Sequence, residues 1–295
     1  MRGCSKPILF TIYYNKGSSI LLFRILMILP LLLLHSPAQE SNTIEEFWSD
    51  LPKEDKLLLT NAGVATGVIA WGFSQWGYGT ESFHTDDEGW FQKDTSNGGS
   101  DKLGHFYTNY LMTRLMSPIY ASWGYDREDA ALYGSMTSLM ISGLLIEVGD
   151  GYSEHGFAVN DLIADSFGVA SGYLLYLYPS LASKIDFRFE YDPFKDTGFE
   201  NQTDFTTDYE RMKHLMAIKA SGFESLQDTP LKYLELHLGY YSRHFNHDSL
   251  PLEGRERTVY MGIGLNLSKL LHPHIGKYAT FFNYFQPPHT YLEYH

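Results

Sequence analysis

The sequence predicts a mainly α protein, in which a four-helix bundle, associated with a membrane or embedded in it, precedes a small C-terminal antiparallel β element. Three observations predict this class. Long uncharged segments recur between residues 57 and 179, small residues recur inside them at four-residue spacing, and a period of two begins after residue 231. We therefore expect a signal peptide or anchor over 1–38, a helical bundle domain over 39–180, and a mixed region with a β-hairpin over 181–295.

The composition restricts the class of partner. Aromatic residues make up 16% of the 295 residues, which argues against intrinsic disorder. The net charge of -13 argues against a nucleic-acid partner, because phosphate backbones attract basic surfaces. The chain has no P-loop and no glycine-rich fingerprint between a strand and a helix, so we expect no nucleotide cofactor.

The N-terminus resembles an export signal. Positive charges precede a ten-residue apolar core, Ile25–Leu34, and small residues then allow cleavage after Ala38. An uncleaved anchor is the alternative. Either form predicts an exported protein of the bacterial cell envelope, at the periplasmic face of a membrane. The single cysteine, Cys4, precedes the apolar core, so it is not a lipid-bearing cysteine of the kind that follows a lipoprotein signal.

The first predicted helix lies in the uncharged segment Leu57–Thr80. Its 24 residues are long enough to cross a bilayer, which needs about 20, although a buried core helix fits equally well. Gly63 and Gly67 form a pair that permits close helix contact. The polar loop that follows, Glu81–Gly99, carries two large aromatic residues, Trp90 and Phe91. We expect this loop to pack over a site and to contact a partner.

Three more helices follow. The first begins with Ser100 as the expected N-cap and runs towards Trp123. The second starts at residues 126–129, three of which are acidic, and continues uncharged to residue 146. The last begins at Asn160 or Asp161, contains a second pair of spaced glycines, Gly168 and Gly172, and ends before Pro179.

Ionisable residues lie near the ends of these three helices, where antiparallel packing would bring them to one side. Such groups are costly in apolar surroundings unless they are paired or functional. We expect one polar cluster, made of Asp101, Lys102, His105, Glu147, Asp150, Asp161 and Asp165.

Three interpretations of the cluster remain open. In a divalent metal site, one histidine joins several carboxylates, with Asp150, Asp161 and Asp165 as the candidate ligands. In an acid–base site, the candidate catalytic residues are His105, Asp101, Lys102 and Glu147, with Lys102 steadying an anion such as a phosphate. In a buried ion-pair network, the same charges would fix helix register without catalysis. Trp90, Phe91 and Asn160 are the candidate partner-binding residues.

The C-terminal region alternates instead. Leucines at 234, 236 and 238 alternate with Glu235 and His237, and residues 259–267 repeat the pattern, which predicts an antiparallel strand pair. Residues 186–207 have little helical period, residues 209–222 are ambiguous between helix and strand, and the tail 281–295 is expected to pack as an extended segment.

Several separated motifs in the helical region resemble the YfiM-like family of bacterial envelope proteins. They are Glu88-Gly89-Trp90-Phe91, the run Gly98-Gly99-Ser100-Asp101-Lys102-Leu103-Gly104-His105-Phe106, Glu147-Val148-Gly149-Asp150-Gly151, and Gly156-Phe157-Ala158-Val159-Asn160-Asp161. The Asp-Lys-x-x-His start is also similar to VanZ-like membrane proteins. The first resemblance implies a lipoprotein-like envelope protein of no assigned activity, and the second favours helices in the membrane.

We therefore expect a structural or binding role, in which the polar cluster holds an envelope lipid or another envelope component. The alternative is a hydrolase that acts on a phosphorylated envelope lipid and is either metal-dependent or based on His105. The sequence leaves a divalent cation as the possible cofactor.

Overall fold

The computed structural model describes residues 42–197, 204–245 and 251–295. The predicted signal or anchor and Cys4 lie outside the described residues. The chain divides into two compact units. Helix α2 (Asn42–Asp50) belongs to the first unit, and the second unit consists of Leu51–Glu200 and Thr206–His295. All the other helices and strands that the structure describes belong to the second unit. The predicted division of the chain near residue 180 stays a prediction.

The helices follow the predicted segments closely. Helix α3 spans Lys53–Gln75 and α4 spans Ser100–Ser122. One continuous helical stretch, Arg127–Asp150, is built from α5 (Arg127–Thr137), the π-helical segment η1 (Ser138–Leu145) and α6 (Ile146–Asp150). Helix α7 spans Val159–Leu177, and the short α8 (Pro179–Ala182) follows it.

The start of α4 corrects one expectation. Gly99, with a φ of 88°, is the N-cap residue, whereas Ser100 is already helical. The Ser100 hydroxyl pairs instead with the Ser242 hydroxyl at 2.7 Å and accepts a hydrogen bond from the Ser242 backbone N–H at 3.2 Å. The helix start is thereby tied to a strand of the C-terminal sheet.

The two predicted pairs of glycines differ in what surrounds them. A Cβ atom at Gly168 would lie 2.1 Å from the Phe106 carbonyl oxygen, and one at Gly172 would lie 2.7 Å from the Thr113 side chain. Helices α4 and α7 therefore approach closely at this seam. At Gly63 and Gly67 of α3, a Cβ atom would meet no atom of the described chain within 4 Å, so the expected helix contact is not made there.

Helix α3 packs against α4 and α5 around a small apolar core. Met116, Tyr120 and Ala130 are buried in it, with Leu57 and Val64 of α3 beside them. The described residues contain two helices long and apolar enough to cross a membrane by length and composition, α3 and Arg127–Asp150. Of the most apolar 18-residue stretch of each helix, 6% is buried in α3 and 50% is buried in Arg127–Asp150.

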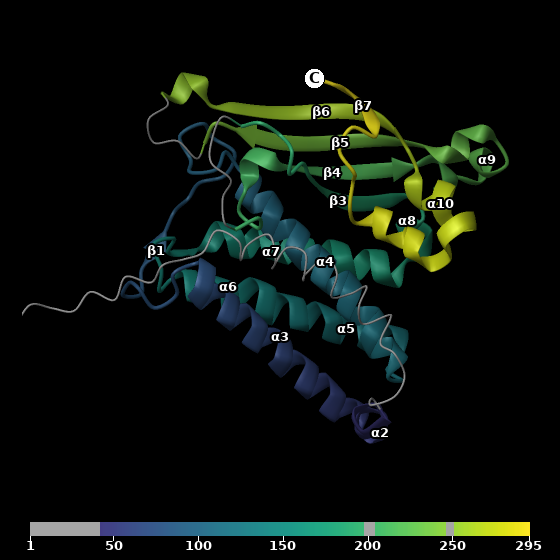
Figure 1. Cartoon of the computed structure of the whole chain (residues 1–295), viewed down its shortest axis with the longest axis horizontal. Helices are drawn as coiled ribbons and strands as arrows, with labels where there is room; N and C mark the ends of the chain where they lie inside the picture. The colour runs from purple at the N-terminus through teal and green to yellow at the C-terminus, as the bar shows by residue number, and fades with distance from the viewer. Residues whose placement is uncertain (1–41, 198–203, 246–250) are drawn as a thin grey trace, which may run out of the picture. The chain divides into compact units, whose positions relative to one another are not determined.

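A five-stranded antiparallel sheet overturns the predicted fold class. Its strands run in the order β3 (Ile185–Tyr191), β4 (Met212–Lys219), β5 (Leu234–Arg243), β6 (Glu256–Leu265) and β7 (Tyr291–Tyr294). The predicted β5–β6 pair is confirmed, but it is the centre of a full layer of the fold and not a small appendage to a bundle (Figure 1). The protein is thus an α+β fold, with helices and strands segregated along the chain.

Aromatic packing joins the sheet to helix α4, and backbone hydrogen bonds cover the free edge of β3. The Phe187 ring of β3 packs edge-on against Phe106 and Tyr110 of α4, with ring centroids 4.9 and 5.3 Å apart. At the outer edge of β3, the Phe189 N–H donates to the Tyr284 carbonyl, and the Gln286 N–H donates to the Phe189 carbonyl. The extended tail therefore begins beside β3 and ends as β7 beside β6.

The sheet has an inverted pattern of burial. Glu235 and His237 of β5 are buried, whereas Leu236 and Leu238, which alternate with them, are 38% and 44% exposed. The outward residues of the neighbouring β6 and β7 are also large and apolar, namely Val259, Met261, Ile263, Leu265, Leu292 and Tyr294. A soluble sheet usually buries its apolar face, so this surface is unusual for a protein in water.

The buried face carries a set of interacting polar and charged side chains that we call the sheet network: Asp186, Arg188, Lys219, Glu235, His237 and Gln286. Arg188 donates to Glu235 Oε2 at 2.8 Å and to Gln286 Oε1 at 2.8 Å. Lys219 pairs with Asp186 at 2.7 Å, and His237 contacts Glu235 at 2.8 Å.

The remaining elements are short. A two-residue parallel pair joins β1 (Thr85–Asp86) to β2 (Phe157–Ala158). Helix α9 (Glu224–Gln227) lies between β4 and β5, and α10 (Leu267–Ile275) follows β6.

Candidate functional site

Three helices bring the predicted ionisable residues together. The first turns of α4 supply Asp101, Lys102 and His105, α6 supplies Glu147, and the first half of α7 supplies two aspartates. We call these residues the helix cluster and include a seventh member from the preceding loop: Glu88, Asp101, Lys102, His105, Glu147, Asp161 and Asp165. All of them except Glu88 and His105 are less than 9% exposed.

Lys102 is surrounded by carboxylates. Its Nζ lies 2.6 Å from Glu88, 2.7 Å from Asp101 and 2.8 Å from Asp161, while the residue itself is 2% exposed. Burial alone would lower the pKa of Lys102, but the three carboxylates outweigh it and raise this pKa. Lys102 is therefore a fixed cation whose charge is already more than balanced.

His105 is the open member of the cluster, with a side chain that is 20% exposed. Its Nδ1 lies 3.1 Å from Asp165 Oδ1 and 3.6 Å from Glu147 Oε1, and its Nε2 lies 3.8 Å from Asp161 Oδ1. Burial alone would lower the pKa of His105. The surrounding carboxylates reverse this effect and raise its pKa well above the ordinary value, so the imidazole is cationic at neutral pH without another cation.

Asn109 was not predicted, although it lies one helical turn after His105. Its Nδ2 donates to Asp165 Oδ1 at 2.6 Å, and the Ser138 hydroxyl donates to its Oδ1 at 2.8 Å. Ser138 opens the π-helical segment η1, and segments of this kind are frequent at functional sites. This second layer of polar contacts holds Asp165 in the orientation that meets His105.

Glu88 was also missed as a site residue, since it lies in the loop before α4. It pairs with Lys102, and burial, followed by repulsion from Asp161, raises its pKa to about 8. Burial likewise raises the pKa of Glu147 to about 8, despite the opposing charge of His105. Both carboxyl groups are therefore poor at holding a negative charge in the cluster as it stands.

Three buried carboxylate oxygens in the cluster accept no hydrogen bond from the described residues: Glu147 Oε1, Asp161 Oδ1 and Asp165 Oδ2. Asp161 Oδ1 lies close to Lys102, but without hydrogen-bond geometry. Buried acceptors are normally satisfied, so each of these calls for a partner.

Two sets of ligand atoms converge closely enough to hold a metal ion. Atoms of His105, Glu147 and Asp161 lie within 4.8 Å of one another, as do atoms of Glu88, Asp101 and Asp161. Lys102 Nζ already lies among the second set. The first set is therefore the better candidate, and it unites residues that we predicted as catalytic with one that we predicted as a ligand.

The other predicted ligand and the predicted partner-binding residues are not members of the two converging sets of ligand atoms. Asp150, at the end of α6, has a pKa raised to about 6 by burial, with opposing contributions from His155 and His105. The Phe91 ring packs against Tyr240 of β5, with centroids 5.4 Å apart. Trp90 is partly buried in the same loop. Their roles stay predictions.

Asn160 holds the loop in place. Its Nδ2 donates to Asp87 Oδ1 at 3.0 Å and to the Gly89 carbonyl at 3.1 Å. Arg255 fixes the next part of the loop by donating to the Thr95 carbonyl at 2.9 Å. These contacts flank Glu88 and deliver it to Lys102, so the loop contributes to the site instead of only covering it.

One comparison with known proteins gives a match. Residues 87–177 match the family described as predicted periplasmic lipoprotein (DUF2279). The matched segment contains every member of the helix cluster. The chain thus resembles an uncharacterised family of periplasmic, lipoprotein-type proteins, which confirms the predicted exported, cell-envelope localisation. No curated protein and no solved structure matches the chain.

Proposed function

We propose that this exported envelope protein binds a divalent cation through His105, Glu147 and Asp161, and that the cation holds an envelope lipid or another envelope component at the membrane. The observation that carries the proposal is the set of three buried carboxylate oxygens that accept no hydrogen bond from the described residues, beside a partly exposed histidine. We also propose that the chain is related to YfiM-like and VanZ-like proteins.

The charge of the cluster supports a cation. Five carboxylates, from Glu88, Asp101, Glu147, Asp161 and Asp165, face two positively charged side chains, Lys102 and His105. Burial, reinforced by repulsion from Asp161, raises the pKa values of Glu88 and Glu147, so their charged forms are costly in the cluster. A divalent ion would offset the excess and supply the unpaired oxygens with a partner.

The ligand atoms favour Mn²⁺ or Zn²⁺ over Ca²⁺. Imidazole nitrogen suits transition metals, whereas Ca²⁺ and Mg²⁺ prefer oxygen alone. Neutral imidazole is the form that binds a metal, so binding would displace the proton that the surrounding carboxylates hold on His105. The exposed side of His105 would leave room for an outer ligand.

The geometry argues against Lys102 as a direct phosphate ligand. Its ammonium group has three carboxylate neighbours within 2.8 Å, and an approaching phosphate would meet their negative charge. A bound metal would reverse the local charge and receive an anionic headgroup in its place.

A second function, hydrolysis of a phosphorylated envelope lipid, is favoured by the pair between His105 and Asp165. A carboxylate at 3.1 Å from Nδ1 orients the imidazole and leaves Nε2 for proton transfer. In this version His105 moves a proton and does not bind the metal, and Glu147 and Asp161 remain as the oxygen ligands.

The exposed apolar surface of α3 supports membrane association. Leu58, Phe73 and Ile69 are 66%, 65% and 38% exposed. A helix of this length with so little burial suits lipid contact, so a transmembrane placement of α3 belongs to the proposal. Extraction of isolated membranes with carbonate tests it. Release of the chain would contradict a spanning α3, whereas retention would support it.

The metal test uses the full chain, purified without chelators, and measures its metal content and its titration with Mn²⁺ by calorimetry. We expect one equivalent of divalent cation, and loss of binding in Glu147→Gln and Asp161→Asn. The matched control is Glu154→Gln, an exposed carboxylate in the loop after α6, which should bind normally.

Three results separate the alternatives. An absence of bound metal, together with no heat on Mn²⁺ titration, would sink the metal proposal and leave a structural ion-pair network. Metal binding without phosphate release from a dispersed phosphatidic acid would favour the binding role. Phosphate release that His105→Gln abolishes, while circular dichroism and Mn²⁺ binding are unchanged, would establish the hydrolase.

A further inference from the structure

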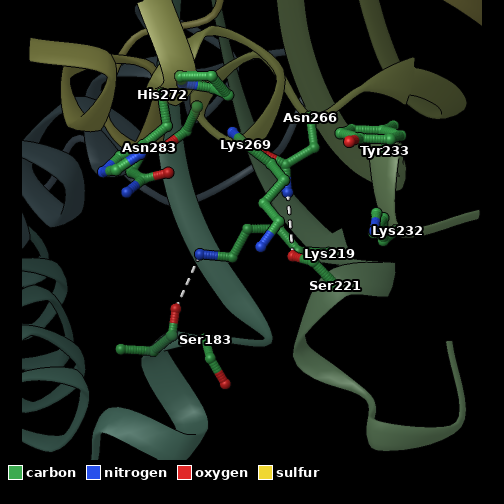
Figure 2. Close-up of a pocket in the computed structure, with 12 residues that line it drawn as sticks. Ser183, Lys219, Ser221, Lys232, Tyr233, Asn266, Lys269, His272 and Asn283 are labelled. Carbon is green, nitrogen blue, oxygen red and sulfur yellow. Dashed lines mark hydrogen bonds between the residues drawn. The ribbon is translucent and has the colours of Figure 1, made fainter. Parts of the chain in front are cut away.

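A second polar region lies away from the helix cluster, in a cavity of about 520 Å³ lined by the end of α8, the end of β4, the segment just before β5, and α10 (Figure 2). Three lysines, Lys219, Lys232 and Lys269, line it together with His272, and no aspartate or glutamate lines it in the described part of the chain. The whole protein carries a net charge of -13, so a cavity lined with positive charge is a local exception. Such an exception points to an anionic ligand.

Two lysines of the cavity have no acidic partner within the described residues. Lys232 lies over the Tyr233 ring at 5.5 Å, and Lys269 is exposed with its ammonium group unpaired. Lys219, by contrast, is held by Asp186 and by the Ala182 carbonyl, and burial lowers its pKa. Lys232 and Lys269 therefore supply the charge available to a ligand.

The cavity also has a fixed polar wall. Asn266 is 2% exposed, its Oδ1 accepts from the Lys269 N–H at 2.9 Å, and its Nδ2 donates to the Ser221 hydroxyl at 3.3 Å. Asn266 is also the N-cap residue of the nine-residue helix α10, whose positive dipole end therefore lies at the cavity. The hydroxyls of Ser221 and Ser268 add donors that a phosphate oxygen can use.

We propose that this cavity binds a phosphate ester. A volume of about 520 Å³ exceeds the need of an inorganic phosphate and suits a phosphate with an attached polar group. The ester can come from a soluble molecule or from an anionic lipid headgroup. Leu265 and Leu270, next in sequence to the lining residues Asn266 and Lys269, are exposed and offer apolar surface to the acyl chains of a lipid. The cavity contains none of the residues proposed as metal ligands, so phosphate binding there is independent of cation binding.

The test compares the full chain with the double variant K232Q/K269Q, which removes two charges while keeping side-chain size. Binding of glycerol 3-phosphate is measured by calorimetry. Binding to vesicles of phosphatidylglycerol, against vesicles of phosphatidylcholine, is measured by co-sedimentation. We expect the double variant to bind at least tenfold more weakly than the unchanged chain. The control is K277Q, which removes an exposed lysine in the segment after α10 and should bind like the unchanged chain.

The outcomes distinguish the sources. Binding of glycerol 3-phosphate that the double variant loses supports the cavity and identifies a soluble ester as a sufficient ligand. Selective binding of phosphatidylglycerol vesicles alone, again lost in the double variant, supports the cavity and identifies a lipid headgroup. The inference is overturned if neither probe binds, if the double variant binds like the unchanged chain, or if K277Q loses as much affinity. Thermal unfolding of each variant verifies that the fold is intact.

Discussion

The sheet network and the helix cluster bury similar residues with different charge balance. In the sheet, Arg188 and Lys219 face Asp186 and Glu235, and His237 adds a further contact to Glu235. Burial would raise the pKa of Glu235, but His237 and Arg188 outweigh it and lower this pKa. In the helix cluster the carboxylates outnumber the cations, and the pKa of Glu88 rises to about 8.

The difference teaches that burial of charge does not by itself indicate a ligand site. The atoms without partners in the sheet network, Arg188 Nε and His237 Nδ1, belong to side chains that are otherwise bonded to carboxylates. The atoms without partners in the helix cluster are carboxylate oxygens that face an excess of negative charge. The carboxylates of the sheet network are balanced by Arg188 and Lys219, whereas the helix cluster has an excess of carboxylates that a cation would balance.

The largest effect is expected from Arg188→Met. This change leaves Glu235 buried without its arginine partner and removes one of the two cations beside Asp186, and we expect a loss of about 3–5 kcal/mol in the free energy of unfolding. Urea unfolding followed by circular dichroism measures it, with Lys277→Met as the exposed control. A loss below about 1 kcal/mol would mean that the sheet network contributes little, since buried pairs normally cost more to break.

Lys102→Met should cost a similar amount, about 3–5 kcal/mol, but with one difference. The oxygens of Glu88, Asp101 and Asp161 converge within 4.8 Å, so Mn²⁺ can replace the lost ammonium group. We expect Mn²⁺ to raise the melting temperature of Lys102→Met more than that of the unchanged chain. It should not rescue Arg188→Met. Equal responses of the two variants to Mn²⁺ would remove the distinction between the clusters.

Gly168→Ala should cost about 1–3 kcal/mol, because a Cβ atom there would press on the Phe106 carbonyl at 2.1 Å. This seam between α4 and α7 brings Asp165 to His105, whereas hydrogen-bonded strands position the sheet network. Gly63→Ala, with no described atom within 4 Å, should instead stabilise its helix by about 0.5–1 kcal/mol. Thermal unfolding compares the two, and a stabilising Gly168→Ala would contradict the close packing.

The last effect concerns pH and separates the clusters by sign. Glu88 has a raised pKa, so its contribution to stability is fully present below pH 4.5 and is lost as pH rises through about 8. Glu88→Gln should flatten this decline by up to about 1.4 kcal/mol per pH unit, measured by urea unfolding in a chelator. Glu235, with its lowered pKa, contributes above its ordinary pKa and loses the contribution as pH falls. Unchanged slopes in Glu88→Gln would refute the assignment.

Much of the helix cluster could be predicted from the sequence, because ionisable residues at the ends of apolar helices have few alternatives to pairing. Asp101, Lys102 and His105 share one helix end, and the alternation of helix direction along the chain places the start of α7, with Asp161 and Asp165, beside the start of α4. Glu88 was missed because a loop residue has no periodicity to place it. Its position within a Glu-Gly-Trp-Phe motif was the available signal. Asn109, four residues after His105, could have been found from helical spacing.

The sheet was largely missed because its strands combine alternation with charge. Asp186, Arg188 and Glu190 alternate with Phe187 and Phe189, which is a period of two, but charged residues at every second position suggest a solvent-exposed face. In the structure that charged face is the buried one. β5 and β6 were recognised because their apolar residues repeat strongly, yet sequence alone did not indicate on which side those residues lie.

The outward apolar face of the sheet changes what drives this part of the chain to fold. Leu238, Val259 and Ile263 stay in contact with the surroundings, so they contribute little of the water exclusion that normally collapses a domain. The strands must instead find their register through backbone hydrogen bonds and through Arg188 with its carboxylates. Replacing Val259 and Ile263 with threonine would therefore leave the fold nearly unchanged while altering which solvent, lipid or protein the surface tolerates.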